Sequence, residues 1–309
     1  MIICCGEALI DMLPRRLPEG ENVFLPVPGG ALFNSAVALG RLGEKTAFLS
    51  GISTDMFGAQ LIGHLKASHV DTGLAVRSEN PTTLAFVSFE NGSAHYCFFD
   101  ENSAARMLHV DQLPALPAGV DALQFGAISL IAEPCGTAYE AFACRHAGDV
   151  VISLDPNIRP GFIIDETAYR ARLGRMIALS DIIKVSDEDL AWLEPGRSFE
   201  AVGKEWISNG TGLVILTRGV DGCRAITADD DIEIEAEKVS VVDVVGAGDA
   251  FNAGVLAALR EAGLLSKQRL KHMDKATLAG ALRFAARVAG HTVGRAGADP
   301  PWKAELDRG

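Results

Sequence analysis

Gly246, Ala247, Gly248 and Asp249 form the stretch whose residue types could do chemistry most directly. They stand between an apolar run, 239–245, and a helical pattern. A Gly-Ala-Gly turn at a helix start leaves backbone N–H groups open, and the partial positive charge of the helix terminus favours an anion there. Asp249 would lie beside that anion, where a carboxylate repels phosphate but can take a proton from an attacking hydroxyl. The stretch is therefore a candidate site of phosphoryl transfer.

The same turn has a second, purely structural interpretation. An Asp near a helix N-terminus is ordinarily a cap or a partner of the helix dipole. Short motifs also recur by chance, so Gly-Ala-Gly-Asp alone favours the cap. The rest of the chain has to supply the evidence for catalysis.

Length, charge and cysteine use are typical of a cytosolic α/β protein. The 309 residues are enough for one large α/β domain or for a domain with a small appendage. The net charge of −12 argues against a nucleic-acid partner, whereas backbone amides and Mg²⁺ can still hold ATP. We expect no signal peptide and no membrane partner, because the N-terminus lacks a basic region and no apolar run reaches about 18 residues. The six cysteines lack Cys-x-x-Cys spacing and should be reduced, and no P-loop motif occurs.

Apolar segments alternate with helical patterns along most of the chain, which predicts an α/β fold. The predicted strands are 2–8, 46–51, 82–90, 93–99, 120–127, 150–154, 181–185, 213–216, 223–227 and 232–239. The predicted helices are 34–42, 56–67, 133–146, 167–179, 249–262 and 275–289.

One hairpin interrupts the alternation. Asn91-Gly92 lies between the strands 82–90 and 93–99, and Asn-Gly between β-branched and aromatic residues is the strongest short hairpin signal. With the Pro-rich stretch 12–28, this hairpin is expected to form a small separate sheet over the active-site edge. We interpret that sheet as a lid, with dimerisation as a second role.

Polar residues follow several predicted strands, at the edge where open α/β sheets bind ligands. Asp11 follows the first strand and is either a ligand-binding residue at this edge or a solvated turn residue. Asn34 follows two glycines and is either a helix-start residue or a partner for substrate hydroxyls. The segment 155–160 forms either part of a site or a structural Asp–Arg pair.

Taken together, the motifs resemble those of the ribokinase-like (PfkB) carbohydrate kinase family. The most specific ones are Gly29-Gly30-x-x-x-Asn34 and Asp243-x-x-Gly246-Ala247-Gly248-Asp249, which occur in the family's order and at its usual separation. The resemblance covers almost the whole chain, from Gly6 to Pro301. It implies a doubly wound, mostly parallel sheet flanked by helices, with a small β lid.

The resemblance also implies a role for each matching residue. Asp249 matches the catalytic base, and Gly246, Ala247 and Gly248 match the anion hole for the transferring phosphoryl group. The expected sugar-site residues are Asp11, Gly29, Gly30, Asn34, Phe99 and Arg159. The expected nucleotide-site residues are Lys184, Thr217, Gly219, Gly222, Gly246 and Gly248. The metal candidates are Asp243, near a monovalent cation site, and Asp189, a water-mediated contact to Mg²⁺.

Within the family, the segments 155–160 and 183–188 look most like bacterial fructokinases. The family's Asn-x-x-Glu magnesium motif appears here as Ser186-x-x-Asp189, with a shorter carboxylate and no amide. Asp100 stands where many relatives carry an arginine, and an acid there disfavours an anionic sugar acid. The resemblance therefore ranks fructose above 2-keto-3-deoxygluconate as the acceptor.

We expect an ATP-dependent sugar kinase that converts D-fructose to fructose 6-phosphate and uses Mg²⁺, with K⁺ as a further candidate. The alternatives are a 2-keto-3-deoxygluconate or nucleoside kinase of the same fold, and a non-catalytic sugar or nucleotide sensor. An oxidoreductase is disfavoured because no Gly-x-Gly-x-x-Gly follows the first strand. Residues 1–11, 29–75 and 105–309 are expected to form the core and 12–28 and 76–104 the lid, which would join two copies into a cytoplasmic homodimer.

Overall fold

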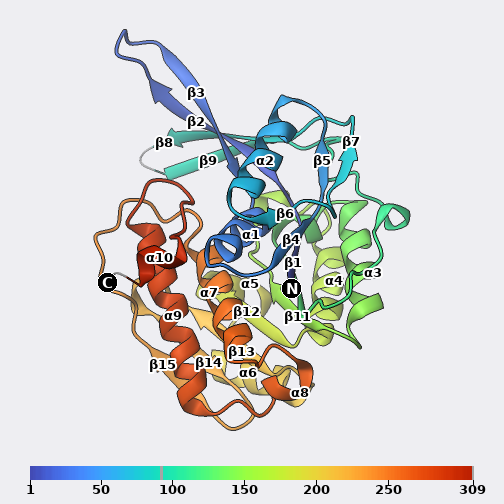
Figure 1. The fold of residues 1–309 in the computed structure, drawn as a ribbon, viewed down its shortest axis with the longest axis vertical. Helices are drawn as coiled ribbons and strands as arrows, with labels where there is room; N and C mark the ends of the chain where they lie inside the picture. Colours follow the sequence, from blue (N-terminus) through green and yellow to red (C-terminus); the bar gives the residue numbers. More distant parts are fainter. Residues whose placement is uncertain (91–92, 308–309) are drawn as a thin grey trace.

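The computed structural model describes residues 1–90 and 93–307, and these are organised around a nine-stranded sheet (Figure 1). In spatial order its strands are β15 (Asp231–Ile234), β14 (Cys223–Ile226), β13 (Leu213–Thr217), β12 (Ile182–Ser186), β11 (Val151–Asp155), β10 (Ala122–Gly126), β1 (Ile2–Cys5), β4 (Thr46–Leu49) and β6 (Val70–Asp71). Neighbours from β6 to β13 pair in parallel, whereas β14 and β15 pair antiparallel at one edge. The winding direction reverses beside β1, which confirms the predicted doubly wound, mostly parallel sheet.

Helices cover both faces of this sheet because successive strand residues point to opposite sides. Ile2 and Cys4 of β1 belong to one apolar cluster, and Ile3 and Cys5 belong to another. The helices on the first face are α1 (Ala31–Arg41), α2 (Met56–Ala67), α7 (Ala247–Glu261), α8 (Lys267–Leu270) and α9 (Lys275–Val293). Those on the second face are α3 (Cys135–His146), α4 (Glu166–Leu179), α5 (Asp187–Leu193) and α6 (Phe199–Ser208). The remaining helices are α10 (Lys303–Leu306) and the 3₁₀ turns η1 (Val110–Gln112), η2 (Ala127–Leu130), η3 (Pro160–Phe162) and η4 (Gly219–Asp221).

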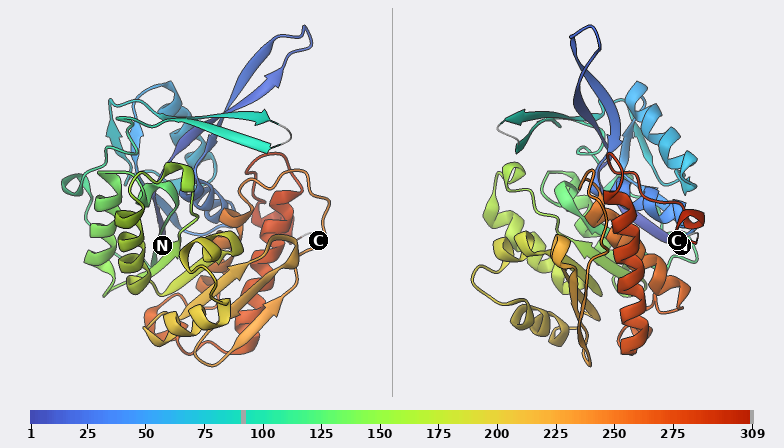
Figure 2. Two further views of the ribbon diagram at one scale, coloured as in Figure 1. Left: turned by 180° about the vertical axis from the view of Figure 1, so that it is seen from behind. Right: turned by 90° about the vertical axis from the view of Figure 1, so that its left-hand side faces the viewer.

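A separate four-stranded sheet lies at one end of the molecule, and its β2–β3 hairpin projects outward (Figure 2). Its strands, in order, are β3 (Asn22–Gly29), β2 (Leu9–Arg16), β8 (Thr83–Glu90) and β9 (Ser93–Phe99). The chain passes from β1 directly into β2, so this sheet stands at the carboxyl end of the central strands. A third pair, β5 (Gly51–Ser53) and β7 (Val76–Ser78), completes the sheets of the described residues.

Several predicted boundaries were wrong, and the first strand matters most for the site. The strand predicted over 2–8 ends at Cys5, and Asp11 lies inside β2 rather than beyond the first strand. The Pro-rich stretch forms regular strand because β3 is an edge strand, and Pro14 of β2 lies beyond the part of β2 that pairs with β8. The two strands of the predicted hairpin are present, while its Asn91-Gly92 turn lies outside the described residues.

The remaining differences concern helices and one apolar run. Helix α6 was not predicted, and α1 and α9 are longer than expected. The strand predicted over 232–239 ends at Ile234, and residues 235–246 form an irregular segment. Within residues 1–90 and 93–307, no helix combines the length and apolar character needed to cross a membrane.

Candidate active site

Helix α7 begins with a turn whose backbone conformation suits only glycine. Its N-cap, Gly246, has φ 76°, and a Cβ at this position would lie 2.6 Å from the Cβ of Ala298. The first N–H groups of a helix have no partner within the helix, and the helix dipole adds partial positive charge there. The Ala247 N–H donates to the Val244 carbonyl at 3.3 Å, so among the described residues the N–H groups of Gly248 and Asp249 are the donors that this turn presents to an anion.

Asp249 lies in the first turn of α7, and its carboxylate is held from another helix. The side-chain N–H of Asn34 on α1 donates to Oδ2 of Asp249 at 2.9 Å, and Ser35 Oγ donates to the Asp249 backbone carbonyl at 3.3 Å. The N-cap of α7 is Gly246, and the described residues provide it with no side-chain cap. Asp249 is therefore not the capping residue that the motif alone suggested.

The electrostatic surroundings make Asp249 a proton acceptor near neutral pH. Burial, with the charge of Asp155, raises the pKa of Asp249 to about 7, although the Asn34 hydrogen bond and the charges of Lys184 and Arg159 lower it. A carboxyl group with a pKa near the working pH is suited to general-base catalysis.

A buried glutamate fixes the start of α1, the helix that carries Asn34. Glu7 Oε1 accepts the backbone N–H of Ala31 at 2.7 Å, while Oε2 is buried without a partner among the described residues. Gly30, the N-cap of α1, has φ 110°, and a Cβ there would lie 2.8 Å from the Glu7 carbonyl oxygen. Burial raises the pKa of Glu7 to about 7. Glu7 therefore fixes the Gly29-Gly30 turn through its hydrogen bond with Ala31.

Asp11 meets the same glycine turn from β2. A Cβ on Gly29 would lie 2.3 Å from Oδ2 of Asp11, so a side chain at this position would displace the Asp11 carboxylate. Burial raises the pKa of the Asp11 carboxyl to about 6. The structure therefore brings Asp11, Gly29, Gly30 and Asn34 together on the side of Asp249 that faces the small sheet.

Three buried polar side chains meet behind the first turn of α7. Asp155 ends β11, Lys184 lies in the adjacent strand β12, and Asn252 lies one turn after Asp249. Oδ2 of Asp155 accepts from Lys184 Nζ at 3.0 Å and from Asn252 Nδ2 at 2.6 Å. Asp155 is therefore paired with Lys184, whereas the guanidinium of Arg159 donates to the Ile158 carbonyl at 3.0 Å.

The two metal candidates are occupied by backbone groups. The oxygens of Asp189 accept the N–H of Ile158 at 2.7 Å and of Ser186 at 3.2 Å. Those of Asp243 accept the N–H of Val245 at 3.1 Å and of Gly297 at 2.9 Å. Among the described residues there is also no group of three or more His, Cys, Asp or Glu side chains suited to a metal. Both carboxylates are therefore held in place by backbone donors.

The other predicted residues lie around the edge of this region. Thr217 ends β13 and donates to the Val185 carbonyl at 3.4 Å, and Gly219 begins the following 3₁₀ turn. Gly222 has φ 82°, and a Cβ there would lie 2.1 Å from the carbonyl oxygen of Ile234. Phe99, at the end of β9, is 61% exposed. It lies on the small sheet, where its ring centroid is 5.5 Å from that of Phe86.

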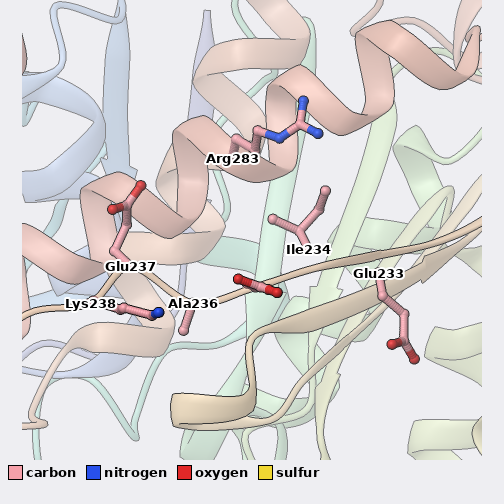
Figure 3. Close-up of a pocket in the computed structure, with 7 residues that line it drawn as sticks. Glu233, Ile234, Ala236, Glu237, Lys238 and Arg283 are labelled. Atoms are coloured by element: carbon pink, nitrogen blue, oxygen red, sulfur yellow. The ribbon is translucent and has the colours of Figure 1, made fainter.

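An open groove beside Gly222 is lined by the end of β15, the segment that follows it and Arg283 of α9 (Figure 3). Three of its lining residues are the glutamates 233, 235 and 237. The lining also holds the cations Lys238 and Arg283. None of the predicted site residues lines the groove, but Ile234 and Ala236 of its lining lie against Gly222 of the predicted nucleotide site.

Sequence reasoning missed Glu7 and Asn252, although each left a signal. Glu7 is a charged residue at the end of an otherwise apolar run, where a buried carboxylate needs a partner. Asn252 follows Asp249 by three residues, and this spacing places both on one face of α7. The Asp155–Lys184 contact left none, because it depends on which strands are neighbours.

The chain is similar to several known proteins. Residues 1–305 match the family described as pfkB family carbohydrate kinase. A fructokinase of Rhizobium leguminosarum bv. trifolii is 50% identical over 278 residues, covering 90% of this chain and 85% of the relative. The crystal structure of a fructokinase with bound ATP from Xylella fastidiosa superposes with a TM-score of 0.89 at 29% identity, covering 99% and 97% of the two chains. A fructokinase from Vibrio cholerae O395, with fructose, ADP and calcium bound, gives a TM-score of 0.81 at 25% identity, with 96% and 94% covered.

Proposed function

Because this chain belongs to the pfkB family of carbohydrate kinases, we propose that it transfers the γ-phosphoryl group of ATP to the primary hydroxyl of D-fructose, yielding fructose 6-phosphate. The observation that carries the proposal is the buried Asp249 carboxylate, which Asn34 holds in the first turn of α7, beside the N-terminal amides of this helix. A binding protein does not need a proton acceptor at this point, whereas phosphoryl transfer to an alcohol does.

The reaction follows from the two sides of the α7 turn. The N–H groups of residues 246–249 hold the γ-phosphoryl group, and Asp249 takes the proton of the primary hydroxyl as its oxygen attacks in line. Mg²⁺ bound with the nucleotide would neutralise charge on the β- and γ-phosphates, with Asp189 as its proposed water-mediated contact. A monovalent cation, with K⁺ as the candidate, is proposed near Asp243.

The sugar is proposed to lie between the glycine turn and the small sheet. Asp11, Gly29, Gly30 and Asn34 would receive its hydroxyls, with Arg159 and Phe99 as outer contacts. Asp100 is held by Thr83 and Ser103, each donating at 2.8 Å, so its carboxylate stays close to this region. Arg106 pairs with Oδ2 of Asp100 at 3.8 Å, so the carboxylates of Asp11 and Asp249, more than that of Asp100, favour a neutral sugar over an anionic sugar acid.

The nucleotide is proposed to lie on the opposite side of the turn. Lys184, Thr217, Gly219 and Gly222 would line its path together with Gly246 and Gly248. Lys184 and Thr217 lie on the adjacent strands β12 and β13. Thr217 pairs with Ser186 where both strands end at their carboxyl side. This is the edge at which open α/β sheets bind ligands.

We also propose that residues 12–28 and 76–104 form a lid over a core made of 1–11, 29–75 and 105–309. Closure would exclude water, which otherwise competes with the sugar as the nucleophile. Phe24 and Leu25 are exposed on the β2–β3 hairpin, which suits a homodimer joined through the lid. The proposed compartment is the cytoplasm.

A panel of acceptors tests the substrate assignment. We expect ATP-dependent formation of ADP with D-fructose, and lower kcat/KM for 2-keto-3-deoxygluconate and for nucleosides. Purified protein in a coupled ADP-release assay gives the comparison, and NMR of the product identifies the phosphorylated hydroxyl. Preference for a nucleoside would overturn the sugar, and no ADP with any acceptor would favour a non-catalytic sensor.

The acid limb of the pH profile tests Asp249. Because the carboxylate form is the base and the pKa of Asp249 is raised to about 7, kcat/KM for fructose should fall as the pH drops below 7. The Asn34 hydrogen bond lowers this pKa, so Asn34→Ala should move the limb to higher pH. Profiles from pH 5 to 9 measure both enzymes, and a limb that stays in place or moves to lower pH would count against Asp249 as the titrating base.

A further inference from the structure

The buried group formed by Asp155, Lys184 and Asn252 does more than join two strands to a helix. All three side chains are at least nine-tenths buried, and both donors converge on one oxygen, Oδ2 of Asp155. The other oxygen, Oδ1, has no partner among the described residues. Burying a charged pair is expensive unless its geometry is good, and well-packed apolar residues could often replace it. Stability alone therefore does not explain why a buried charged pair lies next to the anion-binding turn.

The position of the ammonium supplies that reason. A Cβ built on Gly248 would lie 3.2 Å from Lys184 Nζ, so the ammonium stands directly against the first turn of α7. The glycine leaves no side chain between Nζ and the backbone that receives the anion. Burial lowers the pKa of Lys184, but the charges of Asp155 and Asp189 outweigh it and raise the pKa above its usual value, so the ammonium stays protonated.

We propose that Asp155 and Asn252 hold the Lys184 ammonium against the turn 246–248, where it contacts the phosphoryl group during transfer. This inference rests on the proposed kinase reaction and deepens it. Lys184 is then a catalytic residue, while Asp155 and Asn252 are positioning residues. The fixed positive charge adds to the backbone donors as negative charge redistributes onto the moving phosphoryl group. Asn252 ties the arrangement to the same helix that carries Asp249, so base and ammonium move together.

Lys184→Met tests the inference in the full-length enzyme. We expect kcat to fall by about 10²-fold, the usual effect of losing one preorganised donor to a transition state. ADP with aluminium fluoride and fructose, which mimics the phosphoryl group in transit, should bind correspondingly more weakly, while ADP alone binds nearly as before. Calorimetry measures both affinities. If Lys184 had only a structural role, its substitution would change both affinities together.

A second pair of variants separates position from charge. Asp155→Asn should lower kcat less than Lys184→Met, and the double variant should be no slower than Lys184→Met because the residues act as a unit. The double variant has no unpaired buried charge, so if Lys184→Met does not fold, the kcat of the double variant relative to wild type measures the loss of the ammonium instead. Lys267→Met is the matched control. Lys267 pairs with Asp181 at 2.5 Å, and Asp181 immediately precedes β12, at the end of the strand far from the α7 turn. The kcat of Lys267→Met should be unchanged.

The outcomes distinguish this inference from the function beneath it. A wild-type enzyme that phosphorylates no sugar removes the proposed function together with the role of Lys184. An active wild type whose Lys184→Met variant keeps full kcat and full affinity for the fluoride complex removes the inference alone. A double variant much slower than Lys184→Met would show that Asp155 does not act through the ammonium.

Discussion

Asp249→Asn should lower kcat for fructose phosphorylation by about 10²–10⁴, the range expected for loss of a general base, with little change in KM. Asn has nearly the shape of Asp and can still accept the Asn34 hydrogen bond, so the fold and sugar site stay in place. It cannot take the proton of the attacking hydroxyl. Steady-state kinetics with purified variant and wild type measure the effect, and turnover near the wild-type rate would end the assignment.

The same variant carries its own check on folding. The pKa of Asp249 rises from an ordinary 3.8 to about 7, so the folded state binds this proton more tightly than the unfolded state. The contribution of the carboxyl to stability therefore declines as the pH rises from 3.8 to 7. Asp249→Asn removes the cost of burying this carboxylate in its charged form. The Tm of the variant should therefore exceed that of the wild type at pH 8, with a smaller difference at pH 5. A lower Tm at pH 8 would mean that the kinetic loss reflects damage to the fold.

Gly246→Ala should have the second large effect, a loss of kcat of about 10²–10³, comparable to removing one donor from an oxyanion hole. The alanine must adopt φ near 76° and place its Cβ 2.6 Å from the Ala298 side chain. The packed surroundings leave no room for the added methyl group, so the backbone at residue 246 will shift instead. That shift turns the first N–H groups of α7 away from the phosphoryl group.

Gly196→Ala is the matched control for Gly246→Ala. Gly196 has φ 78°, but a Cβ there meets nothing within 4 Å. Both variants therefore carry similar backbone strain, of roughly 1–2 kcal/mol, and only Gly246→Ala disturbs the anion-binding turn. Equal losses of kcat in the two variants would show that general destabilisation, rather than the turn, accounts for the effect.

The parts of the fold that local patterns determine were predictable from the sequence. Helix α2 and the β8–β9 strands match closely, because a 3.6-residue period and a two-residue alternation are local properties. The turn 246–248 was also predictable, since two glycines before an amphipathic helix leave few alternatives. The catalytic assignment of Asp249 came from this turn together with the second glycine motif.

The remainder depends on tertiary context. The strand predicted over 232–239 ends at Ile234, and in the apolar run that follows, Val241, Val242 and Val244 are all more than half exposed and pair with no described strand. The Pro-rich stretch 12–28 joins the small sheet as expected, but its prolines concealed where β2 and β3 begin and end. The contact between Asp155 and Lys184 requires β11 and β12 to be neighbours, and the local sequence does not specify strand order.

The most direct test is a crystal structure with fructose and a non-hydrolysable ATP analogue. We predict that one carboxylate oxygen of Asp249 lies within hydrogen-bond distance, about 2.6–3.2 Å, of the primary hydroxyl oxygen. The N–H groups of 246–249 should point at the γ-phosphoryl mimic. A carboxylate turned away from the hydroxyl, with the sugar and nucleotide fully bound, would contradict the account.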